Sequence, residues 1–123
     1  TVFRNPALVV ERFLPEREGD RFFLRHYLFL GDHTRSVRVA SPSPFMKRNT
    51  SAPVDEGLPV PDEALVLRRR LGLDYGKIDY VIHNGEVVIL DVNRAVGQPG
   101  APEATARTVG DLADGIWSLL AEG

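Results

Sequence analysis

The sequence predicts an α+β domain, a largely antiparallel β-sheet with two helices packed on it. Two observations lead to this fold class. Stretches rich in valine, phenylalanine, tyrosine and leucine fill the first third of the chain, and similar stretches flank Asn84-Gly85. Two other segments carry either helix-end signals or apolar residues at helical spacing. Tight turns between neighbouring strands favour hairpins, which are antiparallel.

Composition limits the function. The chain has 123 residues, Lys+Arg 15 against Asp+Glu 17, and no cysteine, so we treat residues 1–123 as a single domain without disulfides or cysteine-based metal sites. The slight acidic excess argues against nucleic-acid binding. The longest apolar runs span only a few residues, whereas a membrane helix needs roughly 20. We expect a cytoplasmic domain, and the composition leaves a homo-oligomer open.

The first third reads as strands at 9–10, 21–30 and 34–40, with a tight turn at 30–33. Prolines punctuate the polar segment that follows, which predicts a long loop over residues 41–61. Within this loop, segment 45–49 is a candidate for ligand contact. Arg25 and Arg38 on the two long strands either face a ligand or are solvated. The three histidines, His26, His33 and His83, lack the spacing of metal ligands and are expected at the surface.

Helix signals begin at Pro61, with Asp62 and Glu63 in a first turn, three arginines at 68–70 in a last turn, and Gly72 just beyond. We interpret the arginines as solvated charges that complement the helix C-terminus rather than as an anion site. Trp117 lies beside the apolar stripe of the last segment and is expected to anchor that helix at the sheet. The stripe of this second helix consists of Val109, Leu112, Ala113, Ile116, Leu119 and Leu120.

The most informative segment is the hairpin of residues 75–92 around Asn84-Gly85. A three-residue turn with Gly85 left-handed at a bulge would place Ile82 opposite Glu86. It would segregate the side chains into two faces. One face would then be apolar, with Ile78, Tyr80, Ile82, Val88, Leu90 and Val92.

The other face of this hairpin would carry Lys77, Asp79, Asp91 and Asn93, with Lys77 directly opposite Asp91. Two carboxylates under partial cover repel each other unless a cation lies between them, and carboxylate and amide oxygens suit Mg²⁺ or Mn²⁺. The alternative is a cross-strand Lys77–Asp91 ion pair with Asp79 solvated, and spacing alone weighs the two evenly. The chain leaves the sheet through a Gly/Pro-rich turn at 97–100, which exposes backbone beside the site. This exit favours a metal site over the ion pair.

Segments 75–79, 90–93 and 97–100 resemble the C-terminal half of an ATP-grasp domain, found in ATP-dependent carboxylate–amine ligases. The resemblance implies that Asp79 is the first metal-binding carboxylate and that Asp91 and Asn93 form the acid-x-Asn pair that binds magnesium with the ATP phosphates. The family more often has Glu at the position of Asp91, which leaves one or two metal ions open. Lys77 falls where many members carry a basic residue near the transferred phosphate.

Segment 8–14 resembles the hinge strand of the same family, which meets the adenine. The resemblance assigns Glu11 to the adenine side and Phe13 and Leu14 to the hinge. It also implies a ribose-binding acid a few residues later, for which we favour Glu18. Glu16 and Asp20 are the alternatives for that acid, and a solvated charged loop is the simpler interpretation of this segment.

The resemblance implies the ATP-binding half of a ligase that joins a small carboxylate substrate to an amine or thiol through an acylphosphate. The lysine-bearing N-terminal part of an ATP-grasp domain has no counterpart in residues 1–123, so we expect a fragment of a larger protein that is inactive in isolation. ATP, Mg²⁺ or Mn²⁺, the carboxylate and that missing part would be its partners. The alternative is a non-catalytic module that keeps the half-fold and docks a partner protein.

Overall fold

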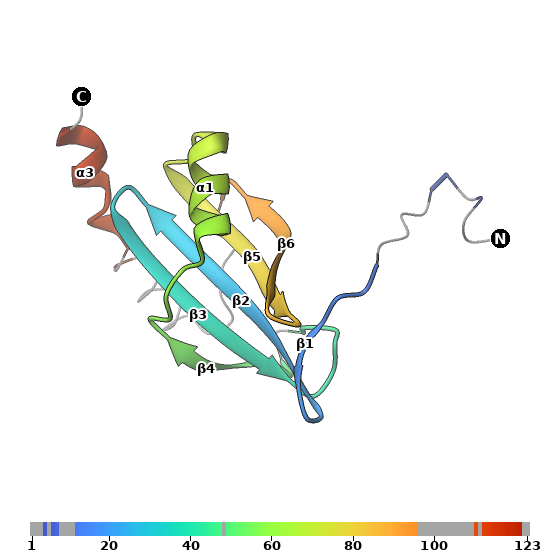
Figure 1. Cartoon of the computed structure of the whole chain (residues 1–123). Helices are drawn as coiled ribbons and strands as arrows, with labels where there is room; N and C mark the ends of the chain where they lie inside the picture. The colour runs from blue at the N-terminus through green and yellow to red at the C-terminus, as the bar shows by residue number, and fades with distance from the viewer. Residues whose placement is uncertain are drawn as a thin grey trace.

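The fold is a layer of antiparallel strands with one helix across its face (Figure 1). The computed structural model describes residues 4, 6–7, 12–47, 49–95, 110 and 112–121. The described strands form a six-stranded sheet in the order β4-β3-β2-β5-β6, with β1 pairing β2, and every described pair is antiparallel, which confirms the α+β class. The elements are β1 (Glu16–Glu18), β2 (Arg21–Leu30), β3 (His33–Ser41), β4 (Ala52–Glu56), α1 (Asp62–Leu71), β5 (Tyr75–His83), β6 (Glu86–Asn93) and α3 (Ile116–Ala121).

The predicted hairpin in the first third is confirmed. Strands β2 and β3 pair from Phe22 opposite Ser41 to Leu30 opposite His33. Gly31 takes a left-handed φ of 59° in the turn, a conformation that glycine adopts without steric cost. The predicted strand at residues 9–10 lies outside the described residues.

The prediction of a long loop over residues 41–61 is wrong, because this segment contains β4. Among the described strands, β4 pairs only with β3, at the edge of the sheet, and Pro53 lies opposite Val39. An edge strand tolerates proline since its missing N–H can fall on the unpaired side. The charged segment after Pro15 is likewise not a solvated loop throughout, since Glu16–Glu18 pairs with β2.

The core lies between the sheet and α1. Tyr27 and Phe29 of β2 and Ile78 and Tyr80 of β5 are almost fully buried on one face, and Ala64 of α1 packs among them. The small alanine side chain lets the helix approach the strands closely. In Figure 1, α1 crosses the sheet over β2 and β5. The opposite face of these strands is therefore free of α1.

The ends of α1 match their sequence signals. Pro61 precedes the helix in an extended conformation, and Gly72 ends it with a left-handed φ of 63°. The N–H of Gly72 donates to the carbonyl of Arg69, and the N–H of Leu73 donates to that of Arg68. These bonds satisfy carbonyls that the helix end would otherwise leave unpaired.

One of the three arginines is not a solvated charge, contrary to the sequence interpretation. Arg68 donates to the Tyr27 hydroxyl at 2.9 Å, to the Gly31 carbonyl at 2.6 Å and to the Leu73 carbonyl at 3.0 Å. Its guanidinium also lies 4.1 Å from the centroid of the Phe29 ring. Arg68 thus ties the end of α1 to the β2–β3 turn, whereas Arg69 and Arg70 are exposed as predicted.

Arg68→Ala is expected to lower the free energy of unfolding by about 2–3 kcal/mol, because it leaves the Tyr27 hydroxyl and two carbonyls without their charged donor. Arg70→Ala, on the exposed side of the same turn, is the matched control and should change stability by less than about 0.5 kcal/mol. Urea unfolding of both variants measures the difference. Equal effects would show that the Arg68 contacts add nothing.

The last helix differs from its prediction. Instead of one continuous stripe, a turn at Asp114 and Gly115 separates Leu112, which is buried, from α3. A Cβ built on Gly115 would meet the Leu30 carbonyl, so this glycine permits close contact with the β2–β3 turn.

Trp117 does not anchor α3, since it is 68% exposed. Ile116 and Leu120 are exposed as well, and Val109 lies outside the described residues.

None of the helices within the described part of the chain has the length and apolar character required to cross a bilayer.

Candidate functional site

The hairpin that carries the predicted site has a different turn from the one expected. Asn84 and Gly85 both have positive φ, 51° and 81°, and His83 pairs with Glu86 across them. This is a two-residue turn, which Asn-Gly favours because both residues tolerate left-handed backbone. The predicted three-residue turn is therefore wrong, and with it the pairing of Ile82 with Glu86.

A bulge further along the hairpin changes the register again. Tyr80 pairs with Ile89 and Asp79 pairs with Asp91, so Leu90 is the extra residue on β6. Leu90 is 54% exposed, and with Val88 it does not belong to the apolar face as predicted. Val87 and Ile89 pack against the core instead, whereas Val92 packs there as predicted.

The combined effect of turn and bulge is to bring the predicted polar residues to one face of the sheet. Asp79 lies directly opposite Asp91, and Lys77 lies opposite Asn93 rather than opposite Asp91. Residues that pair directly across two strands point to the same side. We call these four residues, together with His26, the carboxylate cluster.

His26 joins the cluster from β2, although it was expected at the surface. It pairs with Asp79 across β2 and β5, and its Nδ1 lies 2.7 Å from Asp79 Oδ1. Lys77 Nζ lies 3.3 Å from Asp79 Oδ2. Both oxygens of Asp79 therefore have a partner, and the side chain is only 13% exposed.

Asp91 and Asn93 form the other half of the cluster. Asp91 Oδ1 accepts the N–H of Val92 at 2.9 Å, and Asp91 Oδ2 accepts the Asn93 side-chain amide at 3.0 Å. Because Asn93 binds Asp91 through its nitrogen, its amide oxygen takes no part in that bond. The Lys77–Asp91 ion pair, which was the alternative to a metal site, is not formed. Lys77 binds Asp79 instead.

The electrostatics of the cluster favour a charged Asp79. Burial raises the pKa of its carboxyl group, but the hydrogen bond and charge of His26 and the charge of Lys77 outweigh burial and hold this pKa below its ordinary value of 3.8. Buried Val81 pairs with Val88 two residues beyond Asp79 on the same face. Asp79 is thus an anion beside apolar cover, where charges interact more strongly than in water.

The donor chemistry of the cluster fits a hard divalent cation. The two oxygens of one carboxylate together offer about four lone-pair sites. Asp79 and Asp91 can therefore each accept a further partner beside those described. Among the residues that the structure describes, no three His, Asp or Glu side chains are grouped to hold a metal ion. Two carboxylates and one amide are nevertheless sufficient for Mg²⁺, which commonly keeps waters and phosphate oxygens as its other ligands.

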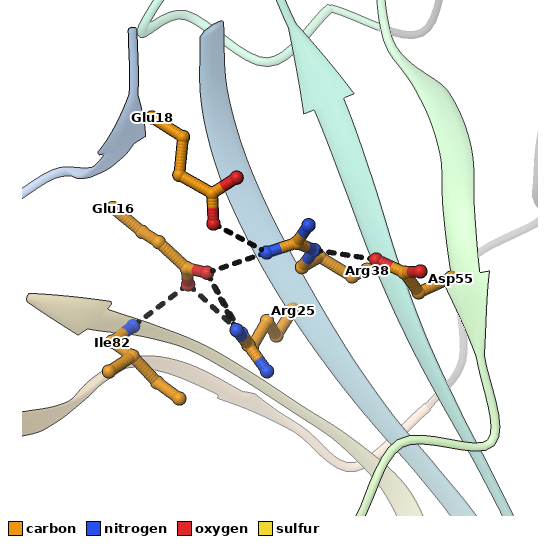
Figure 2. A network of polar contacts seen from close by, with 6 residues as sticks. All are labelled: Glu16, Glu18, Arg25, Arg38, Asp55 and Ile82. Atoms are coloured by element: carbon orange, nitrogen blue, oxygen red, sulfur yellow. Dashed lines mark hydrogen bonds and ion pairs between the residues drawn. The ribbon is translucent and has the colours of Figure 1, made fainter. Parts of the chain in front are cut away.

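Figure 2 shows a second polar network. It lies on the α1 face of the sheet, because Arg25 and its partner Arg38 are on the same side as Tyr27, which packs with Ala64 of α1. Arg25 contacts both carboxylate oxygens of Glu16, at 3.0 and 3.1 Å through Nε, and reaches Oε1 at 2.7 Å through Nη2. The N–H of Ile82 donates to Glu16 at 2.9 Å. Arg38 contacts Glu16 at 3.5 Å, Glu18 at 3.1 Å and Asp55 at 2.8 Å.

Glu16 is the centre of this network. From the sequence it was considered only as an alternative ribose-binding acid in a charged loop, and this structural role was not predicted. Its side chain is 7% exposed. Burial raises the pKa of its carboxyl group, but hydrogen bonds from Arg25 and Ile82 and the charges of Arg25 and Arg38 hold it below its ordinary value of 4.5. Arg25 and Arg38 are therefore neither solvated nor directed at a ligand, but bound to acids of the chain itself.

In the described part of the chain, the predicted nucleotide-binding residues do not lie together. Glu11 lies outside them, Phe13 is exposed and Leu14 is half-buried. Glu18 pairs with Arg21 on the α1 face of β2 and binds Arg38, whereas Asp79 is on the opposite face with His26.

In segment 45–49, Phe45 is exposed and Arg48 lies outside the described residues. The exit at 97–100 also lies outside them.

Comparison with protein-family models, curated proteins and solved structures finds no match to this chain.

Proposed function

We propose that this chain is the ATP- and magnesium-binding half of an ATP-dependent ligase of the ATP-grasp type, joining a carboxylate to an amine or thiol through an acylphosphate. The observation that supports it is the direct pairing of Asp79 with Asp91. Like charges directly opposite each other destabilise a sheet. A cation shared between the two carboxylates would turn this repulsion into attraction, which is the property that a metal-binding hairpin needs.

In this proposal Asp79, Asp91 and Asn93 hold Mg²⁺ or Mn²⁺. The bound cation would offset charge on the ATP phosphates. Lys77 is held beside Asp79 by their 3.3 Å contact, so its ammonium group accompanies the metal ligands on the same face. There it would stabilise negative charge on the transferred phosphoryl group.

The adenine would be bound by the segment that precedes β1, for which Glu11, Phe13 and Leu14 remain the predicted residues. Exposed Phe13 offers apolar surface to a base. Glu18 is left out of the proposed nucleotide site, because its carboxylate binds Arg38 on the other face of the sheet. The small carboxylate substrate and the N-terminal half of the ATP site would be bound by another part of the same protein.

Thermal unfolding of the full-length protein tests this proposal. With MgATP, the melting temperature is expected to rise with ligand concentration above its value in MgCl₂ alone, because ligand binding to the native state adds about 2.7 kcal/mol at a hundredfold excess over Kd. ATP with a chelator is the control and should give a smaller shift. No shift with MgATP would contradict nucleotide binding and favour the partner-docking module.

A further inference from the structure

Asp79 has a partner on β2 that its own hairpin does not supply. His26 lies directly opposite Asp79 across β2 and β5, and His26 Nδ1 lies 2.7 Å from Asp79 Oδ1. The two residues are 53 positions apart in sequence, so this contact depends on the sheet order and not on the turn of the hairpin. The His26 side chain is itself 22% exposed.

The chemistry of the pair fixes the position of one proton. An ionised carboxylate has no hydrogen to donate and only accepts. The hydrogen in the short contact therefore sits on His26 Nδ1, and the imidazole donates to Asp79. This bond holds Oδ1 on the β2 side, while Lys77 approaches Oδ2. The carboxylate is thus fixed from two directions, by one neighbour on β2 and one on its own strand.

We propose that His26 is a positioning residue for the metal site, whose Nδ1–H orients the Asp79 carboxylate for the cation shared with Asp91. This inference rests on the proposed function. Ligating carboxylates are commonly held by such outer hydrogen bonds, whose loss weakens metal binding about 10- to 100-fold. His26 itself does not touch the cation or the nucleotide.

Two substitutions separate the hydrogen bond from the shape of the ring. His26→Phe keeps a planar ring beside Asp79 but removes the donor. His26→Asn loses the ring and keeps an N–H, because the Asn amide nitrogen is as many bonds from the backbone as Nδ1. If the role of His26 were packing, the Phe variant would be the milder change. If it is orientation of Asp79, the Asn variant is the milder one.

The test is a titration of the full-length protein with Mn²⁺ in the presence of ATP, followed by electron paramagnetic resonance. We expect His26→Phe to weaken Mn²⁺ binding about 10-fold or more and His26→Asn to stay within about threefold of wild type. His33→Phe is the matched control, since His33 also binds an aspartate, Asp32, at 2.8 Å, but at the exposed β2–β3 turn. It should leave Mn²⁺ affinity unchanged.

Thermal unfolding of each variant establishes that it is folded. Mn²⁺ binding that is unchanged in His26→Phe, or that is weaker in His26→Asn than in His26→Phe, would overturn the positioning role and leave the proposed function intact. Absence of Mn²⁺ binding by the wild-type protein would overturn both.

Discussion

Replacing Glu16 by alanine is expected to lower the free energy of unfolding by about 3 kcal/mol, because removing one partner of a buried ion pair leaves the other uncompensated. Glu16 accepts from the Arg25 guanidinium and from the backbone N–H of Ile82. Arg25 is only 16% exposed, so water cannot fully replace the lost carboxylate. The variant would also release β1 from the end of β5.

The matched control is Glu18→Ala, two residues later on the same strand. Glu18 also binds an arginine, Arg38, at 3.1 Å, but its side chain is 65% exposed. Exposed pairs contribute at most about 1 kcal/mol, so this variant should remain close to wild type in chemical denaturation. Equal losses in the two variants would show that burial of Glu16 has no special role.

The difference between wild type and Glu16→Ala is also expected to depend on pH. The folded-state pKa of Glu16 lies below the ordinary value of 4.5, so the unfolded state takes up the proton first as pH falls. Its stabilising contribution is therefore fully present above about pH 4.5 and is lost as pH falls through the folded-state pKa. Denaturation curves at pH 7 and in the acid range should show the two proteins converging in acid.

Local signals were sufficient to predict the elements that depend on neighbouring residues. The β2–β3 hairpin, the ends of α1 and the bend at Asn84-Gly85 follow from turn and cap chemistry within a few positions. The strand β4 was missed because proline excludes a residue from most strand positions but not from a sheet edge, and the sequence does not show which strand lies at the edge.

The register of the β5–β6 hairpin illustrates a limit of alternation rules. A two-residue turn without a bulge places Asp79 opposite Leu90, which conflicts with a segregated pattern. A bulge at Leu90 removes the conflict. Among the described strands β6 is an edge strand that pairs only with β5, and an edge strand accommodates a bulge. The shared face of Asp79 and Asp91 was thus predicted correctly, although the turn and the partner of Lys77 were not.

The contacts that the sequence could not predict are those between distant strands. His26 meets Asp79 only because β2 lies beside β5, and Glu16 meets Ile82 across 66 positions. An acid in a charged stretch and a histidine in an alternating strand look like surface residues until the order of strands is known. Sheet order is set by packing of the whole domain, which no short motif encodes.

The proposed shared cation site is tested most directly by Mn²⁺ titration of the full-length protein with ATP, comparing wild type with the double variant Asp79→Asn/Asp91→Asn. Amide side chains keep the shape of both residues but remove the charge that the cation neutralises. Glu56→Gln, a carboxylate at the exposed edge strand that binds Arg35, is the matched control. We expect the double variant to weaken Mn²⁺ binding by about 100-fold or more, with Glu56→Gln unchanged. Equal Mn²⁺ affinity in the double variant and wild type would contradict a metal site at Asp79 and Asp91.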